Sequence, residues 1–129
     1  MKFMLLMTGP RDVEKHLSQW SPSDFKGMVE FMHRLNGELK QRGELVVAEG
    51  LDMPSAARLV RWQKNGPPVV TDGPFAEARE FLTGFWIVDV ASRDRAIAIA
   101  AQASSAPGPG GVPMAIAIEL RQVGEAPKV

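Results

Sequence analysis

Apolar residues recur every three or four positions between residues 25 and 39 of this 129-residue chain. That spacing puts them on one stripe of an amphipathic helix. Ser21-Pro22-Ser23-Asp24 supplies helix-start signals, and Gly43 after Lys40-Gln41-Arg42 is a typical C-terminal stop. A helix of about five turns is therefore predicted between these signals. Its stripe consists of Phe25, Met28, Met32, Leu35 and Leu39.

Other segments have the composition or the two-residue period of strands. Residues 81–90 form the strongest one, and they are apolar on both faces, as in a central strand that is covered on both sides. Asn65-Gly66-Pro67-Pro68 reverses the chain between two shorter segments, which predicts a hairpin. The expected strands are residues 2–8, 44–49, 56–63, 69–71, 81–90 and 115–123.

The remaining segments predict a second helix and several connections. Ser92 is a favourable N-cap for a helix over residues 93–104, with an apolar patch expected at Ala96, Ile97, Ala100 and Ala101. Residues 76–80 favour a helical turn. Loops or turns are expected at residues 9–22, 50–55 and 107–113, and a frayed tail at 124–129.

This order of elements predicts one α+β domain over residues 1–123, a ferredoxin-like antiparallel sheet with two helices on one face. Helices can cover only one face of such a sheet, yet the central strand is apolar on both. We therefore expect a homodimer in which the open sheet face meets that of a second copy.

Composition restricts the classes of partner, the location and the cofactors that we expect for this protein. Fifteen basic and fifteen acidic residues give a formal net charge of zero, which argues against a nucleic-acid binder. The apolar start, Phe3 to Met7, is too short to span a membrane or to form a secretory signal. The absence of cysteine fits a cytoplasmic location. His16 and His33 have no metal-binding spacing, and no metal or other cofactor is expected.

Several segments together resemble the YCII-related, or DGPF-domain, family. Residues 70–77 read Val-Thr-Asp-Gly-Pro-Phe-Ala-Glu, and residues 84–90 read Gly-Phe-Trp-Ile-Val-Asp-Val. Further similar segments are Met1 to Leu6, Glu38 to Gly43, Glu49 to Leu51 and Ile118 to Val123. They follow the family's order over nearly the whole chain.

The resemblance implies a dimeric α+β barrel with a cleft between sheet and helices in each protomer. The wider superfamily includes enzymes that act on small products of aromatic-ring breakdown. Some relatives are associated with extracytoplasmic-function sigma factors, which implies a sigma factor as a further partner. Smaller members are thought to use a His–Asp pair, but the corresponding places here hold Asp24 and the acid-free segment 104–107. That pair is therefore not transferred to this chain.

Asp72 is the family residue that this chain retains, and it has two interpretations. It is a general acid or base at the mouth of a cleft, tuned by burial or by Arg79. Alternatively, it caps the corner by accepting hydrogen bonds from nearby backbone N–H groups. Gly73 and Pro74 specify that corner, because glycine adopts angles that other residues avoid and proline fixes φ.

Four residues besides Asp72 are candidates for the site. His16 lies in the first predicted loop near Trp20, and a loop that covers a cleft would let His16 act on a substrate. Trp20 and Trp86 are candidates for ligand contacts, as is Arg79. At a strand position, however, Trp86 is also suited to the core or to an interface.

The sequence leaves three functional hypotheses open. The first is a small-molecule enzyme that uses acid/base chemistry through Asp72, with His16 as partner. The second is a non-catalytic ligand-binding or regulatory module, for which sigma-factor association would supply a context. The third is a structural dimer without a small-molecule site. A well-formed cavity would count against the third.

Overall fold

The computed structural model describes all 129 residues. Four helix and strand segments precede the hairpin: β1 (Lys2–Pro10), α1 (Val13–Leu17), α2 (Pro22–Gln41) and β2 (Leu45–Gly50). The hairpin consists of β3 (Arg58–Arg61) and β4 (Val69–Asp72). β5 (Glu80–Asp89), α3 (Arg93–Ser104) and β6 (Ile118–Gln122) complete the chain. Two short 3-10 turns, η1 (Pro54–Ala56) and η2 (Pro109–Gly111), lie in the connections.

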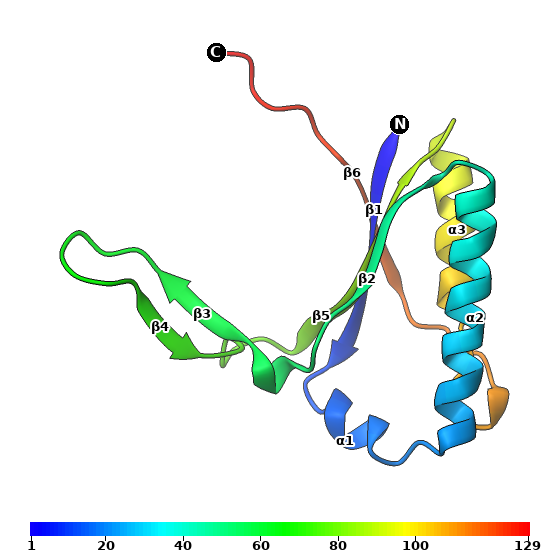
Figure 1. Cartoon of the computed structure of the whole chain (residues 1–129), viewed down its shortest axis with the longest axis horizontal. Helices are drawn as coiled ribbons and strands as arrows, with labels where there is room; N and C mark the ends of the chain where they lie inside the picture. Colours follow the sequence, from blue (N-terminus) through cyan, green and yellow to red (C-terminus); the bar gives the residue numbers. More distant parts are fainter.

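Four strands form one antiparallel sheet in the order β2-β5-β1-β6. β1 and β2, which are connected through α2, thus lie on either side of β5, and β6 lies beside β1 at the edge of the sheet. The long helices α2 and α3 both lie on one face of this sheet (Figure 1). The expected α+β ferredoxin-like fold is confirmed.

The core fills the space between the sheet and the two helices. Strand alternation points Phe3 and Leu5 of β1 inward, opposite Val88 and Trp86 of β5. Burying an apolar side chain of this size contributes roughly 1.5–3 kcal/mol. The helices contribute Leu35, Leu39, Ala96, Ile99, Ala100 and Ala103.

The predicted limits of α2 are confirmed by its capping contacts. Ser21 Oγ accepts from the Asp24 N–H at 3.1 Å, and Asp24 Oδ2 accepts from the Ser21 N–H at 2.9 Å, forming a capping box. Asp24 Oδ1 also accepts from the Gly110 N–H of η2 at 3.0 Å. After the helix, Gly43 adopts a φ of 71°, the left-handed conformation for which glycine is suited.

The structure corrects three predicted boundaries. The expected loop 9–22 contains the helix α1. The expected helical turn over residues 76–80 is shortened to a turn at Ala76 and Glu77, where the Ala78 N–H donates to the Phe75 carbonyl at 3.1 Å, and Glu80 already begins β5. The last strand starts at Ile118 rather than at 115, since Ala115 has a φ of 53° that no strand accommodates.

The predicted composition of the apolar patch on α3 is also partly wrong. Ala96 and Ala100 are buried as expected, but Ile97 is 50% exposed and Ala101 is exposed too. The buried residues recur with the spacing of one helix face, so Ile99 and Ala103 replace those two in the core. Small side chains let α3 pack closely against the sheet.

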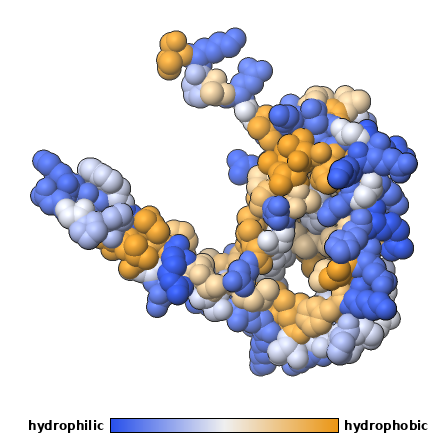
Figure 2. Space-filling model, in the orientation of Figure 1, coloured by the Kyte–Doolittle hydropathy of each residue, from blue (hydrophilic) through white to orange (hydrophobic).

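β3 and β4 form a two-stranded arm that projects from the domain (Figure 1). The predicted hairpin is thereby confirmed. The exposed side chains of the arm include apolar ones. Val60 and Val70 pair across the two strands, and Trp62, which follows β3, is 80% exposed. Figure 2 shows an apolar patch partway along this arm. Residues 124–129 carry no regular structure and are exposed, as expected of the tail.

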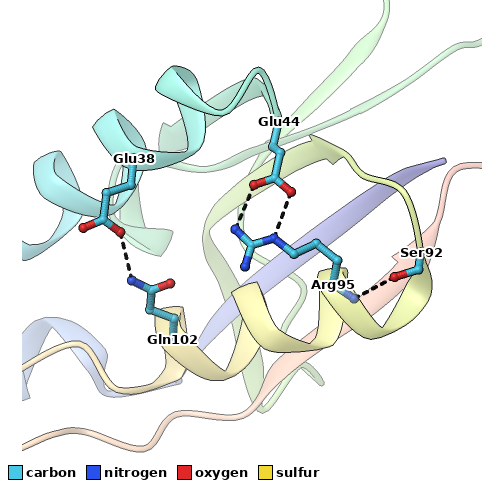
Figure 3. A network of polar contacts seen from close by, with 5 residues as sticks. All are labelled: Glu38, Glu44, Ser92, Arg95 and Gln102. Atoms are coloured by element: carbon cyan, nitrogen blue, oxygen red, sulfur yellow. Dashed lines mark hydrogen bonds and ion pairs between the residues drawn. The ribbon is translucent and has the colours of Figure 1, made fainter.

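An ion pair joins the start of β2 to the start of α3 (Figure 3). Arg95 donates from Nε and Nη2 to the two carboxylate oxygens of Glu44, each at 2.8 Å. Hydrogen bonding from Arg95, more than its charge alone, lowers the pKa of Glu44. Ser92 caps the same helix, because its Oγ accepts from the Arg95 N–H at 3.1 Å.

None of the helices combines the length and the hydrophobicity needed to cross a bilayer. The cytoplasmic location stays a prediction.

Candidate functional site

α2 and the sheet diverge toward the N-terminal end of the helix. Leu35 and Leu39, in the second half of α2, pack in the core, whereas Met28 and Met32 in the first half face a cavity. The cavity has a volume of about 890 Å³, within the range of small-molecule sites. In Figure 2 the surface is hollowed between the sheet side and the helix side, with apolar residues along the lower rim.

Methionine and tryptophan dominate the wall of this cavity. The chain has seven methionines, and five of them line it: Met7, Met28, Met32, Met53 and Met114. Trp20 and Trp86 add two large aromatic side chains. Methionine is unbranched and polarizable, so it adapts to ligands of different shape and packs well against aromatic rings.

The short helix α1 spans the gap between the end of β1 and the start of α2 (Figure 1). Val13 and Leu17 of α1 line the cavity. Two contacts fasten this segment to the base of the arm. Arg11 Nη1 donates to the carbonyls of Ala76 and Ala78 at 2.9 and 3.0 Å, and Glu14 Oε1 accepts from the Ser55 N–H at 3.1 Å. The turn that follows the Asp-Gly-Pro-Phe motif therefore holds the cover of the cavity.

A histidine–carboxylate pair lies on α1 beside the cavity. His16 Nε2 is 3.1 Å from Asp12 Oδ2, and His16 lines the cavity. Both side chains are more than half exposed, so the pair faces solvent at the mouth. A carboxylate in this position fixes the orientation of an imidazole, which is how a general base is held ready.

Inside the cavity, a tryptophan fixes the amide of Asn36. Trp86 is 5% exposed, and its Nε1–H donates to Asn36 Oδ1 at 2.8 Å. Indole nitrogen is a donor only, so the amide oxygen must face Trp86. The NH₂ group of Asn36 consequently remains as a hydrogen-bond donor.

Asp72 and Arg79 lie outside this cavity. Asp72 is in the arm with its side chain 91% exposed, and its carboxylate lies 3.4 Å from Arg58 Nε rather than on backbone N–H groups of the corner. Arg79 is exposed in the connection to β5. Pro74 of the motif borders a smaller hollow of about 390 Å³ at the base of the arm. A catalytic role for Asp72 stays a prediction.

Of the predicted site residues, the cavity brings together His16, Trp20 and Trp86. Trp20 also packs against Phe25, with ring centroids 5.2 Å apart. The sequence pattern does not single out Asp12, although it lies four residues before His16, because the composition of residues 9–22 predicts a loop. It also missed Asn36 and the methionine wall. The signal in the sequence that could have indicated the cavity is that the first half of the α2 stripe contains methionines, whereas the second half contains leucines.

Comparison with known proteins identifies the family of this chain. An uncharacterized protein of Rhizobium meliloti (strain 1021) is 32% identical over 93 residues, which cover 72% of this chain and 74% of that protein. The model of the YCII-related domain matches residues 1–112, which include the arm and all the cavity-lining residues except Met114 and Ile116. The chain therefore belongs to the YCII-related family, as its sequence motifs indicated.

Proposed function

We propose that this protein binds a small, largely apolar molecule in the cavity between the sheet and α2. The observation that carries the proposal is the wall of five methionines and two tryptophans around about 890 Å³. A core that served stability alone would close such a space, because each unfilled methylene volume costs packing energy. The hypothesis of a purely structural dimer offers no reason for the space.

Blocking the cavity tests this proposal. We expect isothermal titration calorimetry to detect binding of 2-acetylnaphthalene to the wild type and none to Met28→Trp, whose indole fills the space. The matched control is Val29→Trp, one residue along α2 and 43% exposed. It should bind like the wild type. Binding that survives in Met28→Trp, with both variants folded, would place the ligand elsewhere and remove the proposal.

A second candidate function is proton-transfer catalysis on the bound molecule, with His16 as acid or base and Asp12 as the residue that orients it. The 3.1 Å contact between His16 Nε2 and Asp12 Oδ2 favours it, because the carboxylate orients an imidazole that lines the mouth of the cavity. In this scheme Asp72 takes no part within the same chain.

Exchange of the methyl protons of 2-acetylnaphthalene with D₂O, followed by NMR, tests the catalytic candidate. Wild-type protein should exceed an equal concentration of free imidazole by about 100-fold, the lower range for general base catalysis. His16→Gln should lose this rate and keep the calorimetric affinity. A wild-type rate no higher than that of imidazole excludes this chemistry for the probe and leaves the binding function as the conclusion.

We further propose that two copies pair through the open face, the side of the four-stranded sheet opposite the helices. Pairing register and alternation place two rows of side chains there. Both rows are apolar in the middle; the second has a charged residue at each end and the first at its β6 end only, which resembles the apolar centre and polar rim of protein interfaces. The first row is Arg121, Met4, Ile87 and Val47, and the second is Glu119, Leu6, Phe85 and Glu49.

A further inference from the structure

The charge of the cavity wall restricts the ligand. Among the residues that line it there is no lysine, arginine or aspartate, and only one acid, Glu49. Ala48 pairs with Trp86 and packs toward the core, so alternation turns the next side chain, Glu49, to the open face. The carboxylate of Glu49 is therefore directed away from the cavity interior.

His16 does not supply an unbalanced charge either. It is the one histidine in the wall, and Asp12 Oδ2 lies 3.1 Å from its Nε2. Whenever the imidazole is protonated, the neighbouring carboxylate offsets its charge. An anionic ligand thus finds no free cation, and a cationic ligand finds no carboxylate within the apolar interior. A charge that leaves water without a partner is strongly disfavoured.

The interior does offer one well-defined neutral donor. Asn36 lines the cavity, and Trp86 holds its amide oxygen, which leaves the NH₂ group for a ligand. A carbonyl oxygen matches this donor, and aromatic rings match the methionine and tryptophan side chains around it.

We propose that the cavity selects uncharged aromatic molecules that carry a carbonyl-type acceptor, with that acceptor placed against Asn36. The proposal rests on the binding function above and names its ligand class. It separates this site from pockets that capture carboxylates or phosphates, which need arginine, lysine or a cluster of N–H groups.

Three planar naphthalenes of nearly equal shape test the charge selection: 2-acetylnaphthalene, the anion 2-naphthoate and the cation 2-naphthamidine. We expect calorimetry at neutral pH to give the ketone at least about tenfold higher affinity than either ion, since a tenfold ratio corresponds to a modest loss of partner contacts. Gln19→Arg, a substitution in the exposed part of the wall, should reduce the difference in affinity between the ketone and naphthoate. Gln122→Arg on β6, outside the cavity, is the matched control and should not.

A second comparison tests the acceptor. The ketone should bind more tightly than 2-isopropenylnaphthalene, which has the same shape but lacks the carbonyl oxygen. Asn36→Asp should abolish that difference, because a carboxylate still accepts from Trp86 but no longer donates to the ligand.

The outcomes separate the two proposals. If either ion binds as tightly as the ketone and Met28→Trp abolishes that binding, the cavity is the site but the charge selection is wrong. Equal affinity of the ketone and the isopropenyl compound removes the role of Asn36. If none of the naphthalenes binds to the wild type, the binding function itself falls.

Discussion

At the scale of single residues, the bidentate contact between Glu44 and Arg95 is the most constrained polar interaction in the domain. The carboxylate of Glu44 is 15% exposed, and both of its oxygens accept from one guanidinium at 2.8 Å. Paired forks of this kind are stronger than ordinary surface ion pairs. The contact fixes the start of β2, an edge strand, to the first turn of α3.

Glu44→Gln should lower the free energy of unfolding by about 1–2 kcal/mol in urea titrations near neutral pH. Glu38→Gln is the control, because exposed Glu38 accepts only one long hydrogen bond, 3.3 Å from Gln102 (Figure 3). It should change stability by less than about 0.5 kcal/mol. Equal losses in the two variants would contradict the importance of the paired geometry.

The same carboxylate predicts a pH dependence. Arg95 lowers the pKa of Glu44 in the folded state below its ordinary value of 4.5. The unfolded chain therefore takes up this proton first, so the contribution is complete above about pH 4.5 and is lost as the pH falls through the lowered pKa. Between pH 7 and acid, the wild type should lose more stability than Glu44→Gln. Parallel curves would contradict this linkage.

Gly73 of the Asp-Gly-Pro-Phe corner lies close against the backbone of Ala57. A Cβ at this position would meet the backbone of Ala57 at 3.3 Å, and the Gly73 N–H donates to the Ala57 carbonyl at 2.9 Å. Gly73→Ala should destabilise the protein by about 1 kcal/mol in urea titrations, because backbone atoms yield little. Asp72→Asn should cost less than about 0.5 kcal/mol, since its ion pair is exposed. The reverse order would assign the structural role to the carboxylate.

At the scale of elements, α1 is a short helix that depends on its neighbours. Five residues are too few for a stable isolated helix, so the fastening by Arg11 and Glu14 decides whether the cavity is covered. Arg11→Gln should raise amide hydrogen exchange in residues 12–18 at least about fivefold while the sheet stays protected. The control is Lys15→Gln, whose exposed side chain makes no such contact. Unchanged exchange in Arg11→Gln would mean that packing alone holds α1.

The elements also show where sequence patterns are reliable. The long helices begin and end within a residue of their predicted limits, because Ser21, Ser92 and Gly43 act through local backbone hydrogen bonds and dihedral angles. The turn predicted at 76–80 forms only around Ala76 and Glu77, and the carbonyls of Ala76 and Ala78 bind Arg11, which is 65 residues away from Ala76. A local pattern contains no information on such a distant donor.

At the scale of the whole molecule, the open face and the projecting arm leave apolar surface uncovered. A two-stranded hairpin is marginally stable by itself, and a sheet with an apolar second face normally has a partner. The proposed pairing of the open faces would cover the apolar face of the four-stranded sheet with one second copy. The 14.1 kDa chain should sediment as a particle of about twice this mass at micromolar concentration.

Ile87→Lys places a charge in the middle of the open face without touching the helix-facing core, so it should convert the dimer to a monomer in sedimentation velocity runs. Val29→Lys is the control, since it adds the same charge to an exposed apolar position of α2. A wild type that sediments as a 14.1 kDa monomer would overturn the proposed pairing. So would an Ile87→Lys variant that remains dimeric.

The sequence by itself determined the family, the ferredoxin-like order of elements and the helix limits. These depend on periodicity, caps and turns, whose causes lie within a few residues of each other. It also singled out His16, Trp20 and Trp86 as site candidates.

Only the tertiary structure decided that these three residues line one cavity, and that Asp72 lies away from it on the arm. The cavity exists because α2 and the sheet diverge, so Met28 and Met32 line it although they continue the apolar stripe of Leu35 and Leu39; Met32 also packs against the edge of the core. The angle between a helix and a sheet follows from the packing of all their side chains together. No single stretch of the sequence encodes it.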